Sequence, residues 1–306
     1  MSAAPLLQLR GIDKSFGPVQ VLRDVDFSAQ AGEVTALVGD NGAGKSTLVK
    51  CISGIYSADS GEVHFDGQPA HISTPRDAAA LGIEVVYQDL ALCDNLDIVQ
   101  NMFLGREKHR GLVLDEPTME QMAGETLAGL SVRTMKSLRQ LVASLSGGQR
   151  QTVAIAKAVL WNSRLVILDE PTAALGVAQT AQVLELVRRL ADNGLAVVLI
   201  SHNMNDVFAV SDRIATLYLG RMVAQVKTTD VTHAQVVELI TAGRSGGLGL
   251  AAGNGNGYNG TAQPVEAQPG TARPGTARPD TTESDDKQPG DEAAEAAETK
   301  IPGADR

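Results

Sequence analysis

Cysteine, tryptophan and long hydrophobic runs are scarce in this sequence of 306 residues. The two cysteines, Cys51 and Cys93, are too few for a disulfide framework and are typical of a reducing compartment. The longest uninterrupted aliphatic run, LAVVLI at 195–200, is far shorter than the ~20 residues that cross a bilayer. The N-terminal MSAAPLLQLRG lacks the basic start and long apolar segment of a signal peptide. We therefore expect a soluble intracellular protein that associates with a membrane only through a partner.

An excess of positive charge is also absent. The sequence contains 26 Lys and Arg residues against 36 Asp and Glu residues, which gives a formal net charge of −10. A protein that binds nucleic acid by neutralising phosphates needs the opposite balance, so we expect no nucleic-acid partner. The hydrophobic content of 43% is sufficient for the core of one or two domains.

Aliphatic residues become rare after Arg244. Residues 245–306 contain 11 Gly and 6 Pro but only four Leu, Val or Ile residues, too few to offset the entropy of the chain. The near-repeat PGTARPGTARP at 269–279 is typical of low-complexity sequence. We therefore predict that 245–306 is a disordered, low-complexity acidic tail.

The preceding residues, 4–244, alternate between predicted strands and helices. The segments IEVVYQ, LVILDE and LAVVLISH are short aliphatic runs of the kind that parallel sheets bury. The segment ATLYLGRMVAQV predicts a hairpin that turns at Gly220. Residues 118–145 lack long β-branched runs and are predicted to be helical. The pattern indicates an α/β fold with a helical insertion.

The segment EVTALVGDNGAGKSTLVK places a glycine-rich loop between an aliphatic strand and a helix, and it satisfies G-x-x-x-x-G-K-[ST]. Glycines let successive backbone N–H groups turn toward phosphates, and a helix that starts at Lys45 points its positive end at them. Lys45 would neutralise the β- and γ-phosphates of ATP, and the Ser46 hydroxyl would ligate Mg²⁺. The predicted ATP-binding residues of this loop are Gly39, Asp40, Asn41, Gly42, Ala43, Gly44, Lys45, Ser46 and Thr47.

A phosphate loop of this kind needs an acidic residue at the end of a later strand, and LDEPT occurs twice, at 114–118 and 168–172. The second copy ends an aliphatic strand, so its acids emerge where open α/β sheets bind ligands. We expect Asp169 to hold Mg²⁺ and Glu170 to polarise the attacking water as general base. In the first copy, Asp115 has the position of a helix N-cap, and we expect no role in the site.

A second glycine-bearing turn, SLSGGQRQ at 144–151, leads into an amphipathic helix and again offers backbone N–H groups to an anion. One monomer cannot readily wrap both loops around one ATP, because the second loop belongs to the helical insertion. In a head-to-tail dimer, each ATP lies between the first loop of one chain and the second loop of the other. The predicted contacts from the second loop are Ser146, Gly147, Gly148 and Gln149.

With both loops in this order, the chain resembles the ATP-binding cassette (ABC) family, whose signature is LSGGQ, over nearly all of 4–240. The resemblance implies a nucleotide-binding domain at 4–244. Its fold would be an α/β P-loop NTPase (RecA-like) core with an antiparallel β subdomain and an inserted helical subdomain at about 89–160. The family requires ATP and Mg²⁺.

The resemblance also implies roles for individual residues. Phe16 would stack on adenine, with an ordinary core aromatic as the alternative. Gln88 would contact Mg²⁺ and the attacking water, and His202 would contact the γ-phosphate. The predicted catalytic residues are Glu170, His202 and Gln88, and the predicted metal ligands are Ser46, Gln88 and Asp169.

DEPTAALG and the stretch PRDAAALGIEVVYQDLALCDNLDIVQNMFLGRE resemble the carbohydrate-importer branch of the family, which energises uptake of ribose, xylose, fructose or galactose. This implies an ATP-hydrolysing homodimer at the cytoplasmic face of the cell membrane. Its partners would be integral-membrane permease subunits and, indirectly, a periplasmic or lipid-anchored sugar-binding protein. The predicted permease contacts are Leu90, Leu92, Met102 and Phe103, with core packing as the alternative for Phe103.

One position departs from the family pattern. Gly176 stands where most cassettes have an aspartate that ties the two nucleotide sites of the dimer together. Its absence removes no catalytic atom, but it weakens the expectation of tight coupling between the sites.

Other functions fit the sequence less well. ABC exporter cassettes are usually fused to a membrane domain, and ABC proteins that act on DNA or ribosomes carry a long coiled coil or a second cassette. A small GTPase needs an N-K-x-D tetrapeptide, which does not occur. A module that binds ATP without hydrolysing it would not need Asp169, Glu170, Gln88 and His202 together.

Overall fold

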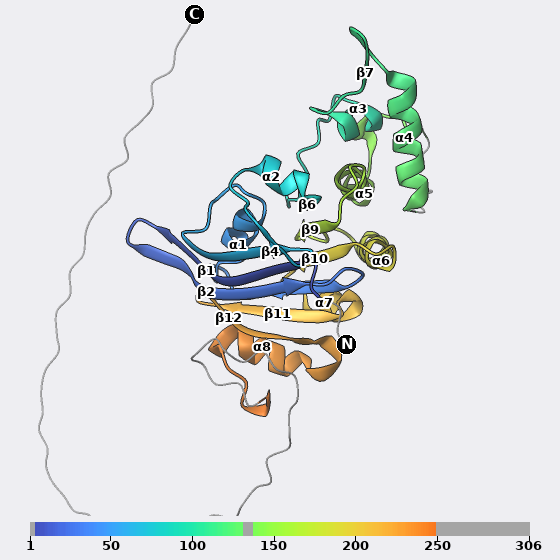
Figure 1. Cartoon of the computed structure of the whole chain (residues 1–306). Coiled ribbons are helices and arrows are strands. Elements are labelled where there is room, and N and C mark those ends of the chain that lie inside the picture. Colours follow the sequence, from blue (N-terminus) through green and yellow to red (C-terminus); the bar gives the residue numbers. More distant parts are fainter. Residues whose placement is uncertain (1–3, 131–136, 249–306) are drawn as a thin grey trace, which may run out of the picture. The chain divides into compact units, whose positions relative to one another are not determined.

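The computed structural model describes residues 4–130 and 137–248, so the predicted tail at 245–306 lies almost entirely outside the described residues. A six-stranded sheet forms the centre of this part of the chain, in the order β12-β11-β3-β10-β9-β6. Figure 1 labels β6, β9, β10, β11 and β12 of this sheet. All its strands are parallel except β12, which pairs with β11 in the hairpin predicted around Gly220. The strands are β3 (Val34–Val38), β6 (Ile83–Val86), β9 (Leu165–Asp169), β10 (Ala196–Ile200), β11 (Arg213–Tyr218) and β12 (Arg221–Lys227).

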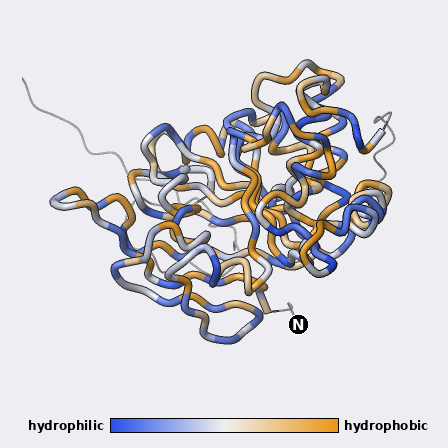
Figure 2. Tube along the Cα trace, turned by 90° about the horizontal axis from the view of Figure 1, so that it is seen from above, coloured by the Kyte–Doolittle hydropathy of each residue, from blue (hydrophilic) through white to orange (hydrophobic). Residues whose placement is uncertain are grey.

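Both faces of this sheet are buried, which explains why its strands are aliphatic without alternation. In β10, Val197 and Leu199 pack into one core cluster, and Val198 and Ile200 pack into another. The hydrophobic segments accordingly run through the middle of the trace in Figure 2. The three segments predicted to be buried parallel strands therefore form β6, β9 and β10.

An antiparallel sheet covers one side of the central sheet, in the order β2-β1-β4-β5. Helix α1 (Lys45–Ile52) buries Leu48, Val49 and Ile52 in the core cluster that the two sheets share. The remaining elements of this region are β1 (Leu7–Phe16), β2 (Val19–Ala29), β4 (Ser60–Phe65), β5 (Gln68–Ala70) and α2 (Pro75–Ala80). This is the predicted antiparallel β subdomain.

Helices lie on the other side of the central sheet and share a core cluster with β6, β9 and β10, although not all of them contact the strands. These are α3 (Ile98–Phe103), α4 (Glu116–Gly129), α5 (Gly147–Val159) and α6 (Val177–Asp192). A short hairpin of β7 (His109–Arg110) and β8 (Val113–Leu114) precedes α4. Helices α7 (Met204–Val210) and α8 (His233–Ala242) form a smaller cluster with β3 and β11. The exact limits of the helical subdomain stay a prediction.

The helix predicted over 118–145 is wrong in its second half. Helix α4 ends at Gly129, and residues 137–145 form turns and the 3₁₀ turn Val142–Ser144. The physical reason is that hydrogen bonds to a distant part of the chain replace those of a helix. The Val142 amide donates to the carbonyl of Leu96 and not to a carbonyl one helical turn earlier. The helix start predicted at Asp115 is confirmed, because its side chain caps the Thr118 amide.

Two of the predicted permease contacts are not exposed, and for Phe103 the alternative of core packing is confirmed. Met102 is 1% exposed and Phe103 is 0% exposed, and both belong to the core under the helices. The Phe103 ring packs edge-on against Trp161 at a centroid distance of 5.5 Å, a contact between residues far apart in sequence. Leu90 and Leu92 are partly buried against the same core. None of the helices in the described part of the chain is long and apolar enough to cross a bilayer.

Candidate functional site

The carboxyl ends of four neighbouring parallel strands meet at one cavity. Gly39 follows β3, His202 follows β10, Glu170 follows β9 and Gln88 follows β6. All four residues line a cavity of about 560 Å³. Parallel strands place their carboxyl ends at the same edge of a sheet, which is where open α/β folds bind ligands. The structure therefore brings together residues that the sequence separates by more than a hundred positions.

The phosphate loop is built for close approach of an anion. A side chain at Gly39 would place its Cβ 2.3 Å from the carbonyl oxygen of Leu217, so only glycine fits there. Helix α1 begins at Lys45, as predicted, and its N-terminus carries no side-chain cap. The Lys45 ammonium donates to the carbonyls of Gly39 at 2.7 Å and Asp40 at 2.9 Å. An uncapped helix start beside a lysine fits a bound phosphate chain.

Two carboxylates adjoin this loop at the end of β9. Burial, and then the neighbouring charge of Glu170, raise the pKa of Asp169 above its usual value. Burial lowers the pKa of Lys45, although the charges of Glu170, Asp40 and Asp169 oppose that shift. The ionised form of Asp169 is thus disfavoured in the protein alone, and a cation would relieve it.

The donor atoms here fit Mg²⁺. Among the residues that the structure describes, no group of three or more His, Cys, Asp or Glu could hold a metal by itself. Magnesium in nucleotide sites is bound by one or two carboxylates together with substrate phosphates and water, so it needs no such group. The carboxylate of Asp169, the hydroxyl of Ser46 and the side-chain amide of Gln88 are the oxygen donors that the sequence predicts for it.

Glu170 and His202 are in direct contact. The Nδ1 atom of His202 lies 2.8 Å from a carboxylate oxygen of Glu170, whose side chain is only 16% exposed, whereas that of His202 is 78% exposed. Glu170 has a φ of 50°, a conformation that costs a residue with a side chain about 1 kcal/mol. Its amide is held by the carbonyl of Ile200 at 3.0 Å, which fixes this backbone turn to the end of β10.

An aromatic pair lies at the end of β1. Phe16 is 41% exposed, which rules out the alternative of an ordinary core aromatic. Its ring meets that of Tyr56 edge-on at 5.1 Å, and the Lys14 ammonium lies 5.6 Å from its centre. Sequence analysis did not find Tyr56. Its place shortly after α1 is a weak signal, because aromatics at that distance from a phosphate loop are also common in cores.

The second loop forms the start of α5. The Ser146 side chain caps the Gln149 amide, and the Gln149 side chain accepts from the Ser146 amide at 2.9 Å. A Cβ at Gly148 would lie 3.1 Å from the Cβ of Gln179 in α6, so glycine permits this close packing of the two helices. None of the predicted contacts 146–149 is among the described residues that line the cavity around Glu170.

Comparison with known proteins decides the family. The family model described as "ABC transporter" matches residues 22–173. The chain is 44% identical over 251 residues to the fructose import ATP-binding protein FrcA of Rhizobium meliloti, covering 80% of this chain and 96% of that protein. This chain belongs to the ABC transporter family. The cassette is an ATPase subunit of that family, and it binds ATP.

Two further relatives support the same family. The cassette is 42% identical over 245 residues to the xylose/arabinose import ATP-binding protein XylG of Sulfolobus acidocaldarius, covering 80% of this chain and 97% of that protein. It is 42% identical over 241 residues to the ribose import ATP-binding protein RbsA 1 of Rubrobacter xylanophilus, covering 79% of this chain and 48% of that protein. The cassette thus spans about half the length of the ribose relative.

The solved structures are both ATP-binding cassettes of ABC transporters. One superposes with a TM-score of 0.69 at 25% identity and covers 77% of this chain and 98% of its own. The other is nucleotide-free, with a TM-score of 0.67 at 25% identity, and covers 73% of this chain and 92% of its own. The fold class predicted from the sequence is confirmed.

Proposed function

We propose that this cassette is the ATP-hydrolysing subunit of a sugar import system and that it works as a homodimer on a membrane permease. The relatives named for fructose and xylose/arabinose import, at 42–44% identity over nearly their whole length, support the sugar assignment. The observation that carries the hydrolytic assignment is the Glu170–His202 contact in the same cavity as the phosphate loop.

Residues of the cavity, of the phosphate loop and of the end of β9 divide the work of hydrolysis. Glu170 acts as general base on the attacking water, and the contact with His202 orients its carboxylate. His202, which is largely exposed, meets the γ-phosphate, and Lys45 leaves the loop carbonyls for the phosphates. Asp169, Ser46 and Gln88 would hold Mg²⁺, which would neutralise charge on the phosphate oxygens.

The second loop serves another copy of the chain. Ser146 is exposed at the start of α5, and the cavity that holds Glu170 is not lined by 146–149. An exposed helix start outside its own nucleotide cavity suits the phosphates of a nucleotide held by a partner. The homodimer therefore sandwiches each ATP between residues 39–47 of one copy and residues 146–149 of the other.

The permease contact lies beside the segment that follows Gln88. A second cavity, of about 260 Å³, is lined by residues of β6, this segment and α5. Tyr87, Leu90, Arg106 and Trp161 are among its lining residues. This cavity adjoins Gln88, so a permease segment bound in it can displace a residue of the nucleotide site. The cassette would thus lie at the cytoplasmic face of the membrane, held there by the permease.

Uptake by intact cells tests the sugar assignment. The chromosomal gene is replaced by one that encodes Glu170→Gln, and uptake of radiolabelled fructose, xylose, arabinose and ribose is measured at equal protein level. We expect uptake of one sugar, or of a related group, to be lost. Unchanged uptake of every sugar, with an ATPase that Glu170→Gln still inactivates in vitro, would remove sugar import and leave the ATPase assignment intact.

A further inference from the structure

Backbone hydrogen bonds join the approach to the second loop, 137–145, to the chain that follows Gln88. The Val142 amide donates to the carbonyl of Leu96 at 3.0 Å. The Ala143 amide donates to the carbonyl of Asp94 at 3.1 Å. The two stretches are nearly fifty positions apart in sequence, so these bonds form only in the folded protein.

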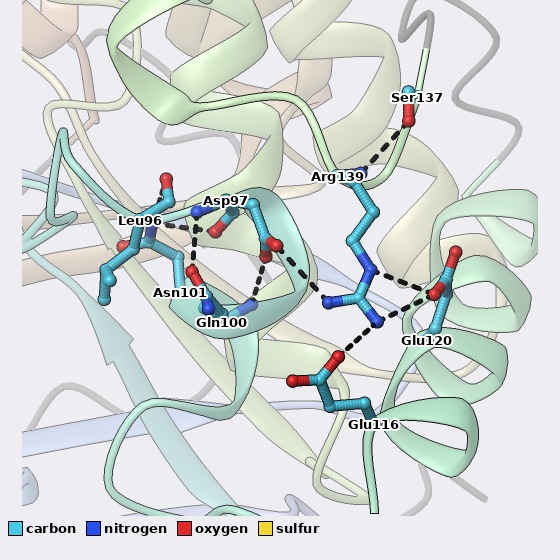
Figure 3. A network of polar contacts seen from close by, with 8 residues as sticks. All are labelled: Leu96, Asp97, Gln100, Asn101, Glu116, Glu120, Ser137 and Arg139. Atoms are coloured by element: carbon cyan, nitrogen blue, oxygen red, sulfur yellow. Dashed lines mark hydrogen bonds and ion pairs between the residues drawn. The ribbon is translucent and has the colours of Figure 1, made fainter.

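A buried asparagine fixes the shape of the chain between Cys93 and Asp97. Asn101 is 0% exposed, and its side-chain oxygen accepts from the Cys93 amide at 2.7 Å. Its side-chain nitrogen donates to the carbonyls of Cys93 at 2.9 Å, Leu96 at 3.2 Å and Asp97 at 3.0 Å. Figure 3 shows Asn101 beneath this turn. The turn is therefore a rigid platform and not a loose loop.

Arg139 ties the same turn to α4. Its guanidinium lies 3.4 Å from Asp97, 3.1 Å from Glu116 and 2.9 Å from Glu120 (Figure 3). Asp97 is also the N-cap of α3, where it accepts from the Gln100 amide at 2.7 Å. The start of the approach to the second loop is thus anchored to both α3 and α4.

Arg150 anchors the other end of the segment 137–145. It lies in the first turn of α5, one turn after Ser146, and its Nη1 atom is 2.8 Å from a carboxylate oxygen of Asp94. Its Nη2 atom donates to the carbonyl of Ala143 at 3.3 Å. The side chain of Arg150 therefore links α5, whose N-cap is Ser146, to the segment 137–145 and to the turn at 93–97.

We propose that the Asp94–Arg150 pair is a latch that positions Ser146 relative to the turn at 93–97, so that a displacement of this turn moves the second loop. The proposal rests on the proposed function, because Ser146 must meet the nucleotide of a second copy. Asp94 and Arg150 are positioning residues, since neither lines the nucleotide cavity. An ion pair between a partly buried arginine and an exposed aspartate adds little to fold stability, so its effect should appear in the dimer and not in unfolding.

The test uses the full chain with Glu170→Gln, which binds ATP without hydrolysing it. The ATP concentration at half-maximal dimerisation is measured by light scattering for three added changes: Asp94→Arg, Arg150→Asp and both together. Asp66→Asn is the matched control, because Asp66 forms an ion pair of the same length, 2.8 Å, with Arg164. Binding of a fluorescent ATP analogue to the monomer is measured in parallel.

Each single reversal should raise the ATP concentration needed by about threefold to tenfold, because two latches act in each dimer. The double reversal should return it to within about twofold of the parent, and Asp66→Asn and analogue binding should not change. The latch is overturned if Asp94→Arg reaches half-maximal dimerisation at the same ATP concentration as the parent. It is also overturned if the double variant needs as much ATP as the single variants do.

Failure of the Glu170→Gln parent itself to dimerise would count against the homodimer and not against the latch. In that case, hydrogen exchange of the amides at 142–146 decides the latch in the monomer. Asp94→Arg should speed their exchange at least threefold, the double reversal should restore it, and unchanged exchange overturns the proposal.

Discussion

The Nδ1 atom of His202 lies 2.8 Å from a carboxylate oxygen of Glu170, at the ends of the neighbouring strands β10 and β9. The pairing of these strands determines the contact, since Ile200 is in register with Asp169. A histidine two residues past one strand end thereby meets an acid one residue past the other. The contact therefore follows from the strand register of the sheet.

Glu170→Gln should lower ATP turnover about 10²–10⁴-fold, because the amide cannot take a proton from the attacking water. Binding of ATP should stay within a few-fold of the parent, since the change leaves the phosphate loop unaltered and Glu170 is paired with His202. Steady-state phosphate release and equilibrium binding of a fluorescent ATP analogue measure the two effects. Turnover within a few-fold of the parent would contradict the role of Glu170.

Asp169→Asn should stabilise the protein at neutral pH in the absence of Mg²⁺ and ATP. The pKa of Asp169 is raised above 3.8 in the fold, so the unfolded chain releases this proton first as the pH rises. Ionisation of Asp169 therefore lowers the free energy of unfolding above about pH 4. An asparagine does not ionise, so the variant keeps this free energy.

Thermal unfolding with EDTA at pH 4 and pH 7 checks this sign. The Tm of Asp169→Asn minus that of the parent should be larger at pH 7 than at pH 4. In the presence of Mg²⁺ and ATP the parent should have the higher Tm, because only the parent has the carboxylate that binds the metal. A Tm difference that does not grow with pH would show that burial of Asp169 is not costly.

Gly176→Asp should be accepted without strain. Gly176 is the N-cap of α6 with φ −73° and ψ 162°, and a Cβ there meets nothing within 4 Å. An aspartate would cap the first turn of α6, so we expect a gain of about 0.5 kcal/mol in the free energy of unfolding. Gly148→Ala is the contrasting variant, because its Cβ would press on Gln179 at 3.1 Å. Urea unfolding compares them, and a loss of stability in Gly176→Asp would contradict the geometry.

Phe16→Ala should weaken ATP binding about tenfold, since stacking of a base on an aromatic ring contributes ~1–3 kcal/mol. Phe16→Tyr should bind nearly as the parent does, and Phe16→Leu should fall between them because it keeps apolar bulk without a ring face. Titration with a fluorescent ATP analogue gives the three dissociation constants. Equal binding by Phe16→Leu and the parent would show that Phe16 does not stack on adenine.

The acids at the end of β9 were predicted because they follow a buried strand, whereas Gln88 and His202 were predicted from the resemblance to the ABC family. Once β9 and β10 are recognised as buried parallel strands, Glu170 and His202 must emerge at one edge of the sheet. The start of α1 at Lys45 and the helix that follows SLSGGQRQ were predictable from local sequence, since a helix start depends on neighbours within about four residues.

What escaped prediction depends on distant partners. The chain at 137–145 is not helical because its amides bond to the turn near Leu96, and no local pattern reveals that turn. Phe103 is buried because Trp161 packs against it, although both are hydrophobic residues that a docking surface could equally use. Tyr56 reaches Phe16 only after β1 and α1 have taken their places.

Light scattering of Glu170→Gln with and without Mg²⁺-ATP tests the central claim, that the two loops of one chain serve different nucleotides. Ser146→Arg is compared with Thr74→Arg, because both residues are exposed N-caps with a capping box, in α5 and α2. The account predicts an ATP-dependent monomer-to-dimer shift that survives Thr74→Arg and is abolished by Ser146→Arg. An ATP-dependent dimer that forms equally well with Ser146→Arg would contradict it.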